Sequence, residues 1–210
     1  AYNGYKGLNP KLLPLVVQKA KAAGLSVSCH VETPADLKHA LRAGVTEINH
    51  LPGYRIRWKE GYQPRYNLIK PSLARRMKKK KVHTDVTFSL GETEIIEPDS
   101  LQYQQRRAVQ IANLRLLKRF GVAVTVGCDS YNLTARTEIN YLHSLGIYSN
   151  LELLKMWCET TPQAIFPNRK TGKLKEDYEA SFLVLKNNPL QQFDALFSIA
   201  LRVKQGYLLW

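Results

Sequence analysis

The sequence lacks any apolar run that approaches the roughly 20 residues needed for a membrane-spanning helix, so it does not predict a transmembrane protein. Cysteine is scarce, with only 3 residues, and Cys29, Cys128 and Cys158 lie far apart in the chain. The odd number and the wide spacing argue against a disulfide framework and against a Cys-x-x-Cys zinc site. The first residues, Ala-Tyr-Asn-Gly-Tyr-Lys-Gly, have no apolar signal core. We expect a soluble protein in the cytoplasm, with the periplasm or secretion as open alternatives.

Acidic residues are also few, because 17 Asp and Glu face 31 Lys and Arg and give a formal net charge of +14. Much of the excess comes from one basic run, which comprises Arg75, Arg76, Lys78, Lys79, Lys80 and Lys81. Aromatic residues precede this run, so a basic nucleic-acid-binding module is one alternative for the function. No nucleic-acid-binding motif accompanies the charge, and cations favour a helix C-terminus. We therefore interpret the run as a solvated helix end and do not expect a nucleic-acid partner.

The hydrophobic periodicity predicts alternating helices and strands followed by an all-strand tail. Helices are predicted at 10–23, 34–44, 98–120, 138–145 and 150–158, the last with Asn150 as a plausible N-cap. Strands are predicted at 25–30, 81–88 and 122–128, with a further one ending at 50, and in the tail at 182–185, 196–203 and 207–210. Strands that alternate with helices are typical of a parallel sheet. The sequence therefore predicts an α/β fold.

Three metal-capable side chains follow apolar runs in this pattern. His30 ends the run Ser-Val-Ser-Cys-His, His50 ends Val-Thr-Glu-Ile-Asn-His, and Asp129 ends Val-Ala-Val-Thr-Val-Gly-Cys-Asp. The carboxyl ends of parallel strands meet at one edge of the sheet, where ligands usually bind. We therefore expect the two imidazoles and the carboxylate to face one shared site.

At these residues the chain resembles the amidohydrolase superfamily. The runs Gly24–His30, Ala43–His50 and Gly127–Ser130 resemble its strands five, six and eight. The tail resembles members of the imidazolonepropionase and prolidase-like type over four segments, which are Thr160–Ala164, Gly172–Leu174, Glu179–Pro189 and Arg202–Gly206. This resemblance implies the C-terminal half of a TIM-like (β/α)₈ barrel over residues 1–165. It also implies strands of a small composite β-sandwich domain over residues 166–210.

The sequence departs from the family pattern by an absence. Family members carry a His-x-His pair on strand one and, when binuclear, a carboxylated Lys or a Glu on strand four, and the sequence has no His-x-His pair. A (β/α)₈ barrel alone typically takes about 250 residues, whereas this chain has 210. We therefore expect the missing N-terminal half of the same protein as a partner, with a homo-oligomer as a further possibility. A catalytically silent fragment or scaffold is the alternative.

The resemblance also implies a chemistry. His30, His50 and Asp129 would bind one or two divalent metal ions, with Zn²⁺ expected because neutral imidazoles suit zinc. Bound zinc can lower the pKa of water to about 7, which supplies a nucleophile near neutral pH. Asp129 would be the catalytic general acid and base that passes the proton to the leaving nitrogen. The expected reaction is metal-dependent hydrolysis of a C–N bond in a small amide, lactam or dipeptide.

Candidate substrate-binding residues follow His50 directly. Tyr54, Arg55 and Arg57 would bind a substrate carboxylate, since the arginine guanidinium pairs with carboxylates in a bidentate manner. They open the polar and aromatic segment 52–67, and a long loop beside a site commonly shapes the choice of substrate. We expect this segment to determine which small-molecule amide is bound.

Overall fold

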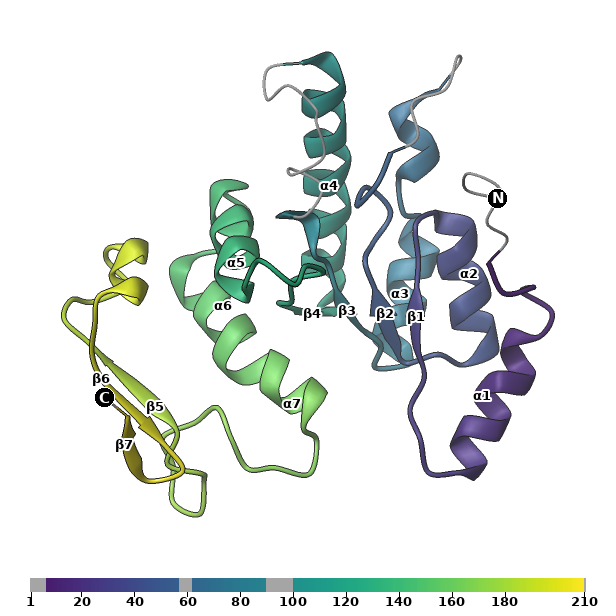
Figure 1. Cartoon of the computed structure of the whole chain (residues 1–210). Coiled ribbons are helices and arrows are strands. Elements are labelled where there is room, and N and C mark those ends of the chain that lie inside the picture. Colours follow the sequence, from purple (N-terminus) through teal and green to yellow (C-terminus); the bar gives the residue numbers. More distant parts are fainter. Residues whose placement is uncertain (1–6, 57–61, 90–99, 210) are drawn as a thin grey trace.

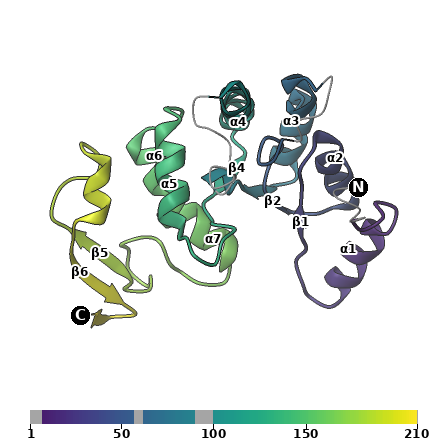
Figure 2. The same ribbon diagram turned by 45° about the horizontal axis from the view of Figure 1, so that its top comes forward.

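The computed structural model of the chain describes residues 7–56, 62–89 and 100–209. Its first part alternates helices with short strands, which are α1 (Leu13–Ala22), β1 (Ser28–His30), α2 (Pro34–Ala43), β2 (Glu47–Asn49), the 3₁₀ turn η1 (Pro64–Asn67), α3 (Pro71–Lys79), β3 (His83–Asp85), α4 (Leu101–Phe120) and β4 (Ala123–Thr125). The strands form a parallel sheet of order β1-β2-β3-β4. Figure 2 shows α2, α3 and α4 on one side of these strands.

The two faces of the parallel sheet differ in polarity. Ile48 and Thr84, which are in register on one face, are fully buried. On the opposite face Glu47 pairs in register with His83, and both side chains are half-buried, while Ser28 is exposed. The described residues thus form an open α/β sheet with an apolar outer face and a polar inner face. They do not close a barrel.

A shared helix-ending motif precedes the strands and explains why their first predicted residues are not part of them. Four helices among the described residues end in a left-handed residue followed by an N–H that bonds back five residues, as in a Schellman motif. The donor and acceptor pairs are Leu25 with Ala20, Val45 with Ala40, Val82 with Met77, and Val122 with Leu117. These apolar donors belong to the preceding helix ends. The predicted strands at 25–30, 81–88 and 122–128 were therefore too long at their first residues.

The second part of the chain contains helices and then an antiparallel sheet. Its elements are α5 (Ala135–Ser144), α6 (Asn150–Lys155), the π-helix η3 (Met156–Thr160), α7 (Thr161–Ile165), β5 (Phe182–Leu185), the 3₁₀ turn η4 (Phe193–Phe197), β6 (Ile199–Lys204) and β7 (Tyr207–Leu209). The sheet order is β5-β6-β7. Figure 1 shows this sheet set apart from the parallel one, with α5, α6 and α7 between them.

One detail of the second part corrects the sequence prediction. The N-cap of α6 is Ser149 and not Asn150, because Ser149 and Glu152 form a reciprocal capping box. Asn150 instead donates from its side chain to the backbone of Pro189, which ties α6 to the segment before η4. No helix in the described ranges has the length and hydropathy needed to cross a bilayer.

Candidate functional site

The structure brings His30, His50 and Asp129 together at the carboxyl edge of the parallel sheet. His30 is the last residue of β1, His50 follows β2, and Asp129 lies four residues after β4. The two imidazole ring centroids are 4.4 Å apart, and His50 Nε2 lies 3.6 Å from Asp129 Oδ2. The structure thus brings the three side chains together at one place, as the strand positions predict.

Hydrogen bonds from the neighbouring strand fix the orientation of His50. Its backbone is left-handed, at φ 65°, and its N–H donates to the Asp85 carbonyl at 2.7 Å. Its own carbonyl accepts from Thr84 Oγ1 at 3.0 Å, and its Nδ1 lies 2.5 Å from Thr87 Oγ1. A non-glycine residue in this conformation is strained and is often found at functional sites. With Nδ1 engaged, Nε2 is the nitrogen that faces Asp129.

The surroundings of His50 keep its imidazole neutral. Burial is the main cause that lowers its pKa to about 4, and the nearby His30 and Arg55 lower it further, while Asp129 opposes the shift. At neutral pH the ring is therefore uncharged. A neutral imidazole is the form that binds metals or accepts a proton.

Tyr54 connects His50 to Asp129. Its ring stacks on His50 with centroids 3.9 Å apart and an interplanar angle of 9°, and its hydroxyl donates to Asp129 Oδ2 at 2.9 Å. The side chain is 1% exposed. The sequence singled out Tyr54 as a substrate residue, whereas the structure places it between two predicted metal ligands. Arg55 lies beside it, with its guanidinium carbon 5.3 Å from the Tyr54 ring centroid.

His30 lies at the site but points to another partner. Its Nε2 is 3.3 Å from Glu32 Oε1, and its side chain is 55% exposed. Within the described ranges no group of three His, Cys, Asp or Glu side chains is arranged to hold a metal ion. His50 and Asp129 do fit one, because two ligands each about 2.0–2.1 Å from a tetrahedral zinc lie roughly 3.4 Å apart, close to their 3.6 Å.

A second carboxylate lies below the site on the inner face of the sheet. Burial raises the pKa of Asp85 to about 6, helped by Glu47 and Asp129 and opposed by the Gly127 N–H. A Cβ at Gly127 would lie 2.1 Å from Asp85 Oδ2, so the absence of a side chain there allows the close approach. The sequence prediction missed Asp85 because the strand was expected to continue to residue 88, whereas β3 ends at Asp85.

Among the described residues, the basic run named from the sequence lies away from this group. Arg57 falls in the segment 57–61, outside the described residues. The basic run forms the end of α3 and the turn after it, where Lys78 Nζ donates to the Gly121 carbonyl at 2.9 Å. Gly121 ends α4 and precedes β4, so the run lies at the amino end of the sheet, opposite the site.

Comparison with known proteins places this geometry in context. No family model matches the chain. Ochratoxinase of Aspergillus niger is 23% identical over 188 residues, a match that covers 87% of the chain and 37% of ochratoxinase. The chain thus spans just over a third of the curated relative that it matches.

Solved structures share the fold. The crystal structure of A. niger ochratoxinase has a TM-score of 0.76 at 21% identity, covering 96% of this chain and 45% of its own. A putative prolidase from Bifidobacterium longum has a TM-score of 0.77 at 20% identity, with coverages of 97% and 51%. An amidohydrolase gives 0.71 at 24% identity, with coverages of 98% and 49%. The resemblance to amidohydrolases predicted from the sequence is therefore confirmed: the chain is a homologue of part of ochratoxinase and has the fold of the matching parts of solved amidohydrolases and prolidases.

Proposed function

We propose that the chain is part of a metal-dependent amidohydrolase that cleaves a C–N bond in a small amide. The observation that carries the proposal is the separation of 3.6 Å between the neutral His50 Nε2 and Asp129 Oδ2, beside His30, at the carboxyl edge of a parallel sheet. This edge is where α/β enzymes place their active sites.

The metal ligands in this proposal are His50 and Asp129, joined by His30 once its ring leaves Glu32. Imidazole nitrogens and a carboxylate oxygen are a donor set that suits zinc. When bound, a divalent metal would acidify a water molecule and polarise the scissile carbonyl. Asp129, half-exposed at this edge, is placed to accept the proton from water and deliver it to the leaving nitrogen.

Tyr54 and Arg55 have separate roles in this proposal. The Tyr54 hydroxyl holds the Asp129 carboxylate through the 2.9 Å hydrogen bond and so orients the proton-transfer group. Arg55 follows it in the same loop and offers a positive charge for a substrate carboxylate. These separate roles of Tyr54 and Arg55 favour, as substrates, small amides that carry a carboxylate, as dipeptides and N-acyl amino acids do.

The names of the relatives support the reaction class. Besides ochratoxinase and a prolidase, the structural neighbours include a Xaa-Pro dipeptidase and a molinate hydrolase. We extend from these proteins to this chain only the hydrolysis of a bond to nitrogen in a small molecule. Fold does not choose among such substrates.

We further propose that a second segment of the same protein completes a (β/α)₈ barrel over the open inner face. The chain covers only 45% of the solved ochratoxinase chain and 51% of the solved prolidase chain. The inner face is polar, with Glu47, His83 and Asp85 half-buried along it. The completing segment would supply further metal ligands and would enclose the substrate.

Hydrolysis assays on the protein with all its segments test the function. A panel of Xaa-Pro dipeptides, N-acyl amino acids and lactams would be offered with and without a chelator. We expect activity that chelation abolishes and that His50→Ala and Asp129→Asn each reduce by at least about 100-fold, since each removes a ligand. His39→Ala, an exposed histidine on α2, is the matched control and should leave activity unchanged. Turnover that survives chelation and both variants would refute the proposal.

A further inference from the structure

The turn that carries Tyr54 is fixed from behind by α4. The Tyr54 N–H donates to the Leu51 carbonyl at 2.8 Å, and Gly53 between them has φ +105°. The sequence Leu-Pro-Gly-Tyr with this geometry matches a type II turn, which prefers proline and then glycine at its two central positions. In such a turn the two central carbonyls take no part in the closing hydrogen bond. Because the turn is buried, those carbonyls need other donors.

Two side-chain amides on α4 supply those donors. Gln110 Nε2 donates to the Gly53 carbonyl at 2.8 Å, and Asn113 Nδ2 donates to the Pro52 carbonyl at 2.7 Å. The exposed fractions of Gln110 and Asn113 are 0% and 1%. Residues three apart on a helix share one face, so both amides reach the same turn. We call this pair the α4 clamp.

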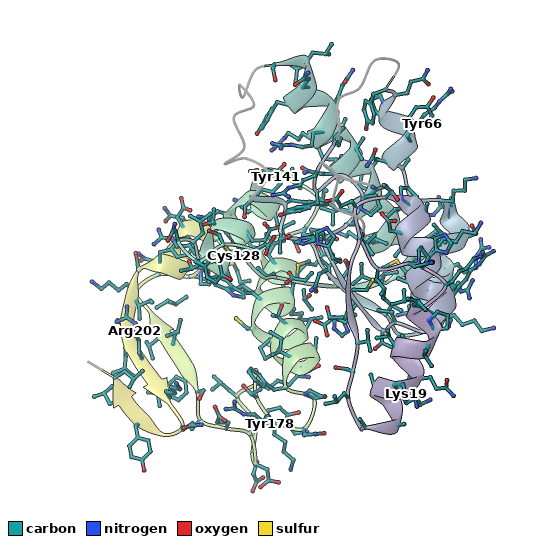
Figure 3. All side chains as sticks on the ribbon, turned by 45° about the vertical axis from the view of Figure 1, so that its right-hand side comes forward. Lys19, Tyr66, Cys128, Tyr141, Tyr178 and Arg202 are labelled. Carbon is teal, nitrogen blue, oxygen red and sulfur yellow. The ribbon has the colours of Figure 1, made fainter. Side chains whose placement is uncertain are left out.

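The other ends of both amides are bonded, which fixes their orientation. Gln110 Oε1 accepts from the Tyr141 hydroxyl of α5, and Figure 3 places Tyr141 in the body of the molecule. Asn113 Oδ1 accepts from the Ile69 N–H at 2.8 Å, and its Nδ2 also donates to the Asn67 carbonyl at 2.9 Å. Neither amide can flip without losing bonds at both ends. The donors are therefore preset toward the turn.

The contact between turn and helix also depends on close approach. A Cβ at Gly53 would lie 3.1 Å from Val109 Cγ1 and 3.3 Å from Gln110 Cγ. The turn backbone therefore lies directly against α4. Tyr54 follows immediately, with its ring on His50 and its hydroxyl on Asp129. A shift of the turn would move both contacts.

We infer that Gln110 and Asn113 are positioning residues, which act through Tyr54 to set the orientation of His50 and Asp129. The inference rests on the proposed function in one respect only: the proposed function says what the site positioned by Gln110 and Asn113 is for. Neither residue touches His50 or Asp129, and neither is a catalytic residue. Their effect is transmitted by the Pro52–Gly53 backbone and the stacked Tyr54 ring.

The test uses NMR of the protein with all its segments, labelled at the histidine Cε1 position, without metal or substrate. An aromatic ring stacked at 3.9 Å shifts the His50 ring proton upfield, and Tyr54→Leu defines the unstacked value. In Gln110→Met and Asn113→Leu we expect the signal to move most of the way to that value. Lys118→Met is the matched control, because Lys118 is on the same helix but bonds to Ile147 and Glu152 instead. The control should keep the wild-type shift.

Folded Gln110→Met and Asn113→Leu variants with the wild-type His50 shift would overturn the inference. If these variants do not fold, Tyr141→Phe decides, because it leaves Gln110 in place and removes the donor to its Oε1. A His50 signal displaced toward the Tyr54→Leu value supports the clamp, and an unchanged signal refutes it. The NMR shift is measured without catalytic turnover. An unchanged shift therefore refutes the α4 clamp, whereas the hydrolysis assays test the proposed function separately.

Discussion

The Tyr54 hydroxyl donates a hydrogen bond of 2.9 Å to Asp129 Oδ2 while the Tyr54 ring lies flat on His50. This contact joins two segments 75 residues apart and fixes the carboxylate relative to the imidazole. In the proposed enzyme these two groups act on the same atoms, so their relative orientation bears directly on the rate.

Tyr54→Phe should slow hydrolysis while the fold persists. The phenyl ring can still stack on His50, but Asp129 loses a hydrogen bond to a charged group, worth roughly 1.5–3 kcal/mol. If that loss falls on the transition state, kcat drops by about 10- to 160-fold. Steady-state kinetics on the assembled protein measure it, with circular dichroism to check folding. A phenylalanine variant with wild-type kcat would show that the hydrogen bond does not matter.

Gly127→Ala should destabilise the chain. The added methyl group would lie 2.1 Å from Asp85 Oδ2, so the Asp85 carboxylate or the backbone beside it must shift. Overpacking of this kind typically costs about 1–3 kcal/mol. Urea unfolding followed by circular dichroism gives the change in the free energy of unfolding. Gly7→Ala is the control, because nothing lies within 4 Å of its Cβ position. Equal stability of the two variants would contradict the described packing.

Glu138→Gln should change how stability depends on pH. Burial raises the pKa of Glu138 to about 7, against hydrogen bonds from Ser89 and Phe88 that lower it. The folded state therefore binds its proton more tightly than the unfolded state. This contribution is fully present below pH 4.5 and is lost as the pH rises through about 7. It amounts to roughly 3 kcal/mol.

The measurement is urea unfolding of wild type and Glu138→Gln between pH 4.5 and 8. The stability of the glutamine variant should rise relative to wild type across this range, because glutamine does not ionise. Glu176→Gln changes an exposed glutamate and should run parallel to wild type. Parallel curves for Glu138→Gln would mean that Glu138 does not titrate in this window.

Thr161→Val should weaken the junction between the π-helix η3 and β4. The Thr161 hydroxyl donates to the Met156 carbonyl at 2.8 Å and accepts from the Val126 N–H at 2.9 Å. Valine keeps the shape but leaves the buried Val126 N–H without its acceptor, at a cost of about 1–3 kcal/mol, whereas the Met156 carbonyl still accepts from the Thr161 N–H. Thermal unfolding should show a lower Tm for Thr161→Val and partial recovery for Thr161→Ser. A valine variant as stable as the serine variant would refute this role.

The sequence is sufficient to predict the shared position of His30, His50 and Asp129, since side chains that follow parallel strands meet at one edge. It does not predict strand lengths, because the apolar residues Leu25 and Val122 serve the ends of the preceding helices. Hydrophobicity alone cannot separate these two uses. The helix-ending glycines Gly24 and Gly121 were the available signal.

The site contacts were harder to predict than the site positions. The hydrogen bonds of Tyr54 to Asp129 and of Thr87 to His50 join residues 75 and 37 positions apart. Such pairs depend on how strands and loops are placed in three dimensions, which periodicity does not determine. The turn at 51–54 was readable from its Pro-Gly pair, and the polar residues Gln110 and Asn113 lie three apart beside the buried Leu114. Together these features indicate a helix face that binds backbone.

The central claim is that His50 and Asp129 hold a divalent metal. The most direct test is the zinc content of the protein purified with all its segments and dialysed, measured by plasma mass spectrometry for wild type, His50→Ala, Asp129→Asn and the control His39→Ala. The account predicts at least one equivalent of metal per chain in wild type and His39→Ala, and a marked loss in the other two. A wild-type protein that binds no divalent metal, or one whose metal survives both site substitutions, would contradict it.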